Sequence, residues 1–154
     1  MKKLSEEEIT EKIISFCNYR ERSSKEVLKK LFSLESDYKF SKKILNQLIK
    51  VNLINDLRFS KSFCRGKFKI NKWGKIKIRY HLIKKGIMEY EIKEGLNSIN
   101  SNEYNDTIKD LLIKKKKNLN IKKNKVLKQK LFSYLSQKGY EQNLILKHVN
   151  NSIS

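Results

Sequence analysis

Apolar residues recur along the chain at intervals of three and four, which is the spacing of a buried stripe on an α-helix. Proline is absent and only five of the 154 residues are glycine, so the turn-rich patterns of β architectures find little support. The pattern therefore predicts an all-α protein. A chain of this length can form one compact domain or a short array of helical repeats.

An internal repeat favours the array. Residues 71–86 align without gaps on residues 124–139, at a constant offset of 53 positions, and the apolar positions stay in register beyond the two final glycines. The first third of the chain repeats the pattern more loosely, with Val27 and Leu31 at the matching apolar positions. We therefore expect three tandem units of three helices each, at residues 8–54, 55–100 and 103–151.

Local signals place several helix ends. Ser23 and Glu26 have the spacing of a capping box, in which each side chain satisfies a backbone N–H group of the other, so a helix is predicted from Ser24 to Leu34. Gly86 and Gly139 each follow a lysine-rich turn, which is typical of a helix that ends in a left-handed residue. We expect the preceding helices to stop at these glycines.

The helix before Gly86 carries apolar residues on two faces. Its second face holds Ile76, Tyr80 and Ile83, whose counterparts in the last repeat are all polar. In a solenoid a middle repeat has a neighbour on each side, whereas an end repeat has only one. The sequence therefore predicts that these three side chains pack against a neighbouring repeat, and the alternative is an exposed docking stripe.

The chain is strongly basic, with 36 Lys and Arg against 16 Asp and Glu and a formal net charge of +20. The net charge rises from +4 in the first third to +7 in the middle and +9 in the last. No carboxylate lies between Asp56 and Glu89 or between Asp110 and Glu141. A polyanion is the partner that such a chain fits, and these two stretches are the candidate binding strips.

The first strip covers the middle repeat. Four of its cations recur at helical spacing and form a basic stripe, while Phe59, Phe63 and Ile70 fall on another face, so this helix is predicted to pack and bind at once. A merely solvated helix face is the alternative. The candidate nucleic-acid or filament-binding residues are Arg58, Lys61, Arg65, Lys67, Lys69, Lys72, Lys75, Lys77, Arg79, Lys84, Lys85, Lys128 and Lys130.

Three other residues lie within this strip or at its edge. Trp73 and Tyr80 could stack on an unpaired base, but we interpret them as packing residues, which is the commoner role of large aromatic side chains. Asp56 is interpreted as a helix N-cap rather than a metal ligand, because aspartate is a preferred capping residue.

The sequence lacks the residues that several classes of enzyme and metal-binding protein need. His81 and His148 are isolated from each other and from the cysteines, and no G-x-x-x-x-G-K-[ST], G-x-G-x-x-G, H-E-x-x-H or G-x-S-x-G string occurs. Cys17 and Cys64 are expected to be buried, reduced thiols. We expect no cofactor, no metal site and no enzymatic activity.

The distribution of apolar runs predicts a cytoplasmic protein. Glutamates between Glu6 and Glu11 stand where a signal peptide needs an unbroken apolar segment. No stretch approaches the run of about 18 apolar residues that a transmembrane helix needs, so no membrane partner is expected.

Three segments carry a family resemblance. They are residues 17–27 (CNYRERSSKEV), residues 55–63 (NDLRFSKSF) and residues 74–87. In their order and spacing they resemble the successive signatures of RecX, a family of bacterial regulators of the RecA recombinase. The resemblance covers almost the whole chain and is weaker from Glu103 onward. The positions that match the family motifs are Arg20, Arg22, Ser23, Asp56, Arg58, Phe59, Phe63 and Gly86.

The resemblance implies three three-helix repeats in an elongated, curved array that lies along the groove of a RecA filament. It implies modulation of RecA, mostly inhibition of its ATPase, strand-exchange and co-protease activities, by a monomer that contacts single- or double-stranded DNA. Lysine stands here at many of the family's arginine positions, which keeps the attraction to phosphate but loses the planar guanidinium fork. A stand-alone helix-turn-helix DNA-binding protein is the alternative, while a nuclease lacks a visible metal or acid–base set.

Overall fold

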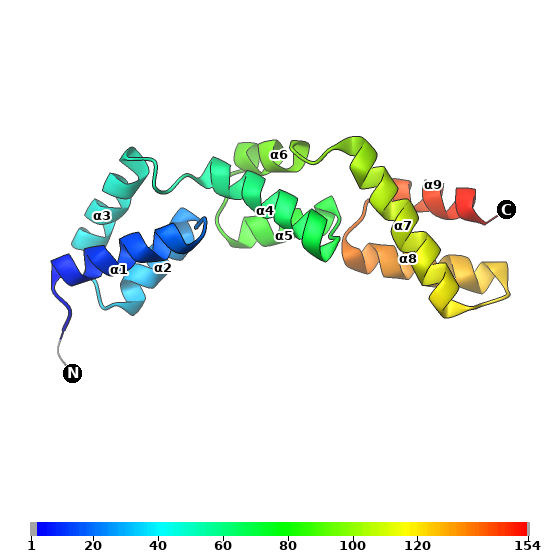
Figure 1. Ribbon diagram of the computed structural model, residues 1–154, viewed down its shortest axis with the longest axis horizontal. Helices are drawn as coiled ribbons and strands as arrows, with labels where there is room; N and C mark the ends of the chain where they lie inside the picture. The colour runs from blue at the N-terminus through cyan, green and yellow to red at the C-terminus, as the bar shows by residue number, and fades with distance from the viewer. Residues whose placement is uncertain (1–2, 154) are drawn as a thin grey trace. The chain divides into compact units, whose positions relative to one another are not determined.

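The computed structural model describes residues 3–153, and all regular secondary structure in that range is helical. The helices form three successive sets of three (Figure 1), which confirms the prediction of an all-α chain of tandem three-helix units. Their bounds are α1 Glu6–Tyr19, α2 Ser24–Ser33, α3 Tyr38–Lys50, α4 Asp56–Asn71, α5 Lys75–Lys84, α6 Glu89–Asn97, α7 Ser101–Leu119, α8 Asn124–Lys138 and α9 Gln142–Ser152.

The described residues divide into two compact units. The first comprises the chain up to Ser62 together with Leu82–Gly95, and the second comprises Phe63–His81 together with the chain from Leu96 onward. In the first unit, α2 packs against both α1 and α3 around an aliphatic core that includes the buried Cys17 thiol. Each unit therefore has a helical core of its own.

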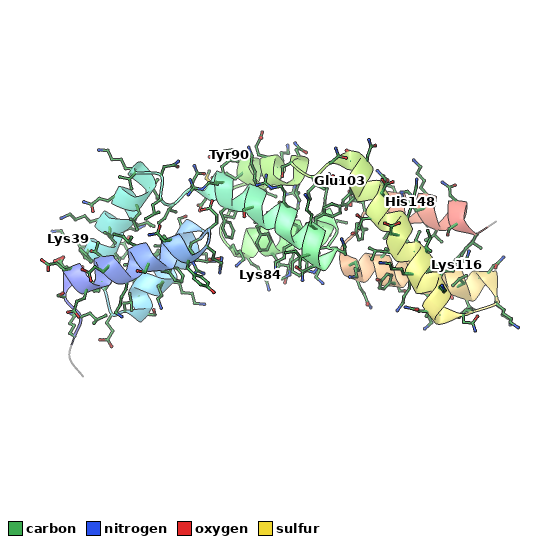
Figure 2. The ribbon with its side chains drawn as sticks, in the orientation of Figure 1. Lys39, Lys84, Tyr90, Glu103, Lys116 and His148 are labelled. Carbon is green, nitrogen blue, oxygen red and sulfur yellow. The ribbon has the colours of Figure 1, made fainter. Side chains whose placement is uncertain are left out.

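In the second unit, α7, α8 and α9 pack against one another. Figure 2 shows Lys116 on α7 and His148 on α9, and the Lys116 ammonium donates to the carbonyl of Ser152 at 2.9 Å. Cys64 lies in this unit and is buried, so the prediction of buried cysteines is confirmed for both.

The repeat register appears in the burial of the middle helix of each set. The apolar pairs at equivalent positions are all fully buried, which removes their surface from water and stabilises the folded chain by about 1.5–3 kcal/mol for each side chain. These pairs are Val27 and Leu31, Ile78 and Leu82, and Leu131 and Leu135.

The same three helices end in one recurring turn. In each, a left-handed residue follows the helix, and the amide of the next residue donates to a carbonyl five positions earlier, which is a Schellman motif. The left-handed residues of α5 and α8 are Gly86 and Gly139, so the predicted helix stops are confirmed. The amide-to-carbonyl pairs are Ser36 to Leu31 at 3.2 Å, Ile87 to Leu82 at 3.1 Å and Tyr140 to Leu135 at 3.1 Å.

The start of α2 confirms one half of the predicted capping box. The Ser23 hydroxyl accepts a hydrogen bond from the Glu26 amide at 3.1 Å. The other half is wrong, because the Glu26 carboxylate turns to the Lys85 ammonium at 2.9 Å and to the Arg20 guanidinium at 3.4 Å instead of the Ser23 amide. Two cations compete better for a carboxylate than a single neutral N–H group does.

The prediction that Asp56 caps a helix needs a similar correction. The first turn of α4, its own helix, is capped by Asn55, whose Oδ1 accepts from the Arg58 amide at 2.9 Å. The Asp56 carboxylate instead accepts from the amide and the hydroxyl of Ser24, at 2.7 and 2.6 Å. Asp56 therefore caps α2, a helix more than thirty residues earlier in the chain.

In the second compact unit the start of α5 abuts the end of α8. The amides of Gly74 and Ile76 donate to the carbonyls of Lys138 and Gly139, at 2.8 and 2.9 Å. The first amides of an α-helix have no partner within that helix, and the last carbonyls have none in theirs. The junction satisfies two amides and two carbonyls of these sets, and it aligns the positive end of one helix dipole with the negative end of the other.

Glycine is required on both sides of this junction, because a Cβ atom at Gly139 would lie 2.3 Å from the Cβ atom of Lys77. A Cβ atom at Gly74 would lie 2.4 Å from the backbone of Gly139 and Tyr140. A related junction occurs in the first unit, where Gly86 lies against the Lys25 side chain and the Lys25 ammonium donates to the Lys84 carbonyl at 2.9 Å. Gly86 and Gly139 are equivalent in the repeat, so the same glycine position lies at both junctions.

Candidate nucleic-acid interface

Two of the predicted binding cations in the first compact unit are held within the protein. The Arg58 guanidinium pairs with Glu21 and donates to the carbonyls of Asn52 and Leu53, at 3.0 and 3.1 Å. Lys85 pairs with Glu26. These contacts hold Arg58 and Lys85 against the protein, whereas Lys61 is half-buried and Lys84 is exposed on the surface.

The predicted cations of the second unit all reach the surface to some degree. Helices α4, α5 and α8 carry them, together with the left-handed residue that follows α4. Such partly covered lysines keep their aliphatic stems on the protein and their charged ends near water. The exposed residues are Arg65, Lys69, Lys72 and Lys130, and the half-buried ones are Lys67, Lys75, Lys77, Arg79 and Lys128.

Trp73 is the centre of a cationic and aromatic cluster in the second unit. The ammonium groups of Lys67 and Lys77 lie 5.0 and 4.7 Å from its ring centroid, which is cation–π distance. The His81 ring lies 4.6 Å from the Trp73 ring, and the Tyr80 ring meets His81 edge-on at 5.5 Å. The cluster brings two of the predicted binding lysines together at one half-buried aromatic side chain.

The packing predicted for the second face of α5 is wrong. Ile76, Tyr80 and Ile83 keep 55, 55 and 56% of their surface exposed. Ile70 on α4 was also placed on a packing face and is 81% exposed. Within the described residues, the alternative of an exposed apolar stripe on α5 is therefore the one that the structure supports, and Tyr80 is not a core residue.

The positions that match the RecX motifs have mostly structural contacts. Ser23 is fully buried and caps α2, Asp56 bonds to Ser24, and Arg20 pairs with Glu26. Phe59 is buried and Phe63 half-buried on α4, and Gly86 ends α5 with a positive φ. Arg58 has the contacts given above, and Arg22 donates to the Phe16 carbonyl at 2.9 Å, so all eight positions have contacts within the fold.

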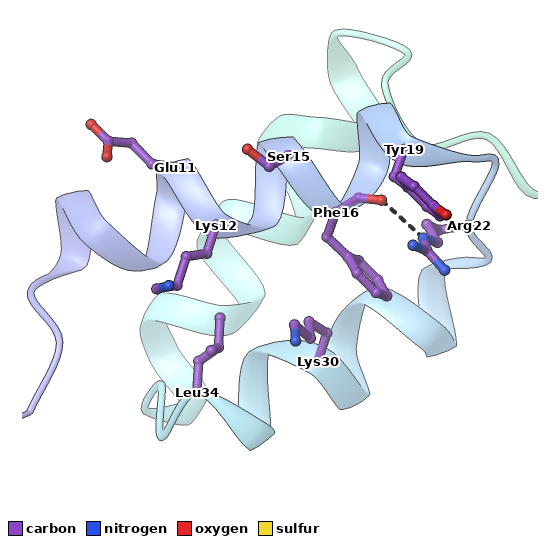
Figure 3. Close-up of a pocket in the computed structure, with 8 residues that line it drawn as sticks. All are labelled: Glu11, Lys12, Ser15, Phe16, Tyr19, Arg22, Lys30 and Leu34. Carbon is purple, nitrogen blue, oxygen red and sulfur yellow. Dashed lines mark hydrogen bonds between the residues drawn. The ribbon is translucent and has the colours of Figure 1, made fainter.

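Two hollows of about 580 and 460 Å³ lie over α1 and α2 in the first unit. Figure 3 shows the larger one. Both are lined by Phe16, Arg22 and Lys30. Sequence reasoning missed this site because the first third has the lowest net charge of the chain. The signal that could have indicated it is the set of basic residues that follow Tyr19 in the sequence, namely Arg20, Arg22, Lys29 and Lys30.

His148 is buried on α9, with its Nε2 atom 2.8 Å from Oδ1 of Asn105. Burial lowers the pKa of His148, and the cations of Lys109 and Lys147 lower it further. Among residues 3–153 no group of three or more His, Cys, Asp and Glu side chains could hold a metal ion. The histidine is therefore a neutral, hydrogen-bonded core residue.

This depressed pKa predicts a loss of stability in mild acid. The unfolded chain takes up a proton at His148 near pH 6.5, while the folded chain does not, so the free energy of unfolding should fall as the pH drops below about 6.5. His148→Gln should reduce this fall, and Lys109→Gln, which removes one repelling cation, should reduce it in part. Urea titrations of the three proteins between about pH 8 and 5 measure the effect, and identical slopes would contradict it.

No helix in the described part of the chain combines the length and the apolar character needed to cross a bilayer.

Family comparison agrees with this helical architecture. The family model described as "RecX, second three-helix domain" matches residues 55–96, and "RecX, third three-helix domain" matches residues 102–149. Together they cover more than half of the chain. Crystal structures of RecX from Lactobacillus salivarius and of a second RecX superpose with TM-scores of 0.86 and 0.81, each at 23% identity. They cover 95 and 94% of this chain, and it covers 95 and 73% of theirs.

Curated relatives carry the same name. Regulatory protein RecX of Clostridium acetobutylicum is 34% identical over 131 residues, which are 82% of this chain and 60% of that protein. The RecX of Streptococcus agalactiae serotype V is 30% identical over 137 residues, which are 88% of this chain and 52% of that protein. The chain thus spans between half and two thirds of these two relatives' lengths. On these matches, the chain belongs to the RecX family of regulatory proteins.

Proposed function

We propose that this chain binds RecA recombinase filaments on DNA and inhibits their ATPase, strand-exchange and co-protease activities. Family membership gives the regulatory role, and the cationic middle repeat is the observation that carries the proposal. Between Asp56 and Glu89 there are eleven Lys and Arg residues and no carboxylate. Nine of the eleven remain when Arg58 and Lys85, which pair with Glu21 and Glu26, are set aside. A strip of this kind attracts the phosphates of the DNA that the filament encloses.

The proposed mechanism is preferential binding. A ligand can shift an assembly away from its active state only if it binds another state more tightly, or if it covers a site that the active state needs. We propose that the repeats at residues 8–54, 55–100 and 103–151 bridge neighbouring recombinase subunits and obstruct their movement. The exposed apolar residues on α5 supply non-polar area for such a protein contact.

We also propose where the chain acts and which protein hydrolyses ATP. The chain acts in the cytoplasm as a monomer, and ATP turnover belongs to the recombinase, because the sequence contains no phosphate-binding loop motif. It needs no cofactor of its own. A role in DNA repair and in the SOS response follows from inhibition of the recombinase.

Co-sedimentation tests the proposal. The chain should pellet with preformed recombinase filaments at concentrations where it leaves naked DNA of the same length in solution, at the same ionic strength. Equal partition onto bare DNA would favour a stand-alone DNA-binding protein. A preference of roughly a thousandfold or more for one duplex sequence would favour a sequence reader.

Removing three cations of α5 should weaken the salt dependence of DNA binding. Lys75, Lys77 and Arg79 all lie in the second compact unit, and their replacement by alanine removes up to three phosphate contacts while keeping good helix formers. The slope of log K against log salt concentration should become shallower by about 2 to 3. Fluorescence anisotropy with a labelled duplex measures this slope.

The matched control removes three cations elsewhere. Lys39, Lys42 and Lys43 are exposed on α3, so their triple alanine variant has the same net charge as the α5 variant. It should keep a slope close to that of the parent protein. If the two variants change the slope equally, the effect comes from net charge, and α5 is not the site.

A further inference from the structure

Arg22 is held in a fixed orientation in the hollow between α1 and α2. Its Nε atom donates to the carbonyl of Phe16 at 2.9 Å, and its guanidinium carbon lies 3.7 Å from the centroid of the Phe16 ring (Figure 3). The Tyr19 ring lies 5.8 Å away. Within residues 3–153 neither Nη atom of Arg22 makes a hydrogen bond or an ion pair. A planar fork of N–H donors is therefore positioned for an anion.

The charge around Arg22 is positive and poorly compensated. Two acidic residues line the hollows, but Glu26 is neutralised by Arg20 and Lys85, and Glu11 points away from Arg22 (Figure 3). Burial and the neighbouring Arg20 cation lower the pKa of Arg22, although an arginine remains charged at neutral pH. A bound anion would relieve this repulsion. The other cations that line the hollows are Lys12, Lys29 and Lys30.

An exposed aromatic ring stands beside this fork. Tyr19 lines the larger hollow and keeps 84% of its surface exposed, so packing does not account for it. Exposed aromatic rings next to cations are the means by which single-strand binders hold an unpaired base and its phosphate. The hollow is shallow and open to solvent, and its volume of about 580 Å³ falls in the range of small-ligand sites.

We propose that this hollow binds a nucleotide of single-stranded nucleic acid, with its phosphate on Arg22 and Lys30 and its base against Tyr19. The proposal rests on the proposed function in taking nucleic acid as the ligand, and it adds a second contact point and a preference for unpaired strands. A duplex keeps its base faces stacked inside the helix and has none to offer Tyr19. An acidic peptide would satisfy the cations, but its carboxylate groups would not use the exposed ring.

The strongest test removes the ring. Tyr19→Ala should weaken binding of a labelled oligothymidylate of about 20 nucleotides by about tenfold, because stacking of one base is lost. Its affinity for a duplex of the same length should not change. Tyr38→Ala, which removes another exposed tyrosine of the first unit, is the matched control and should leave both affinities unchanged. Anisotropy measures both affinities, in the absence of recombinase.

A second pair of variants tests the fork. Arg22→Gln should weaken oligothymidylate binding by about tenfold, and Arg22→Lys should recover only part of that loss, because lysine keeps the charge without the planar donors. Lys43→Gln removes one exposed charge from α3, outside the hollows, and should leave affinity within about twofold of the parent. If the Arg22 variants lose their helical circular dichroism, the Tyr19 result decides.

Three outcomes would overturn the proposal. Equal effects of Tyr19→Ala and Tyr38→Ala would show that the ring has no special contact. Equal loss of single-strand and duplex affinity would show an unspecific cationic surface. If poly-glutamate changed the tyrosine fluorescence of the chain and oligothymidylate did not, the hollow would be a site for an acidic peptide. Filament co-sedimentation is scored separately, so this site can fail while the proposed function stands.

Discussion

Gly74→Ala is expected to lower the free energy of unfolding by about 3 kcal/mol or more. The new Cβ atom would lie 2.4 Å from backbone atoms of Gly139 and Tyr140, which no side-chain rotation can relieve. The start of α5 and the end of α8 would have to separate, and the hydrogen bonds from Gly74 to Lys138 and from Ile76 to Gly139 would be lost. Urea denaturation followed by circular dichroism measures the change.

Gly66→Ala is the matched control for this variant. Gly66 lies within α4, and a Cβ atom there would meet nothing within 4 Å. Alanine has the higher helix propensity, so this variant should raise the free energy of unfolding by about 0.5–1 kcal/mol. If Gly74→Ala proved as stable as Gly66→Ala, the close junction between α5 and α8 would not exist in solution.

Tyr104→Phe is expected to lower the free energy of unfolding by about 2 kcal/mol. The Tyr104 hydroxyl accepts from the amide of Lys75 at 2.9 Å and donates to the Glu141 carboxylate. Burial raises the pKa of Tyr104, and its bond to Glu141 raises it further, so the phenol stays protonated and keeps donating. Phenylalanine would leave an amide at the start of α5 and a half-buried carboxylate without their partner.

Tyr134→Phe separates this loss from a general effect of removing a hydroxyl. Tyr134 is half-buried on α8, and its ring meets the ammonium groups of Lys115 and Lys138, which phenylalanine preserves. We expect a change within about 0.5 kcal/mol. Both variants can be compared in one set of urea titrations, and equal destabilisation would remove the assigned role from the Tyr104 hydroxyl.

The helices and their register could be predicted because both depend on short-range signals. Spacing of apolar residues by three and four fixes the buried face, and the glycines at positions 86 and 139 fix two ends through their left-handed backbone. The first repeat uses Glu35 at the equivalent left-handed position, with a φ of 60°. A non-glycine residue there gives no sequence signal, which explains why the first third matched the other two more loosely.

The partners of the carboxylates could not be predicted from spacing alone. Glu26 and Asp56 both stand at helix starts, as local capping rules require. Their actual partners lie 59 and 32 residues away, at Lys85 and Ser24. Local rules identify a residue that can cap a helix, whereas the fold decides which donors reach it.

The second face of α5 was misinterpreted for a related reason. The solenoid argument assumes that neighbouring repeats meet through the faces of their helices. In the second compact unit the last repeat meets α5 at its end, through the backbone at Gly74 and Gly139. That junction leaves the side chains of Ile76 and Tyr80 exposed. Sequence periodicity reports that a face is apolar, but it does not report what covers the face.

The positive charge in the hollow between α1 and α2 could not be predicted from the sequence either. Carboxylate-free stretches directed attention to the middle and last repeats, because formal charge was counted along the chain. In the folded first unit, Glu26 is paired and Arg22 is not, so the local field is more positive than the count suggests. Arg58 shows the opposite case. It counts as a cation in the sequence, but in the folded unit its guanidinium pairs with Glu21.

The ATPase rate of the recombinase on DNA tests the central claim most directly. It should be measured as the chain is added up to stoichiometric excess, at a salt concentration where the chain does not coat bare DNA. The account predicts that ATP turnover falls as the chain saturates the filaments and that added competitor DNA does not restore it. Unchanged turnover at full excess, or inhibition that competitor DNA abolishes, would contradict the account.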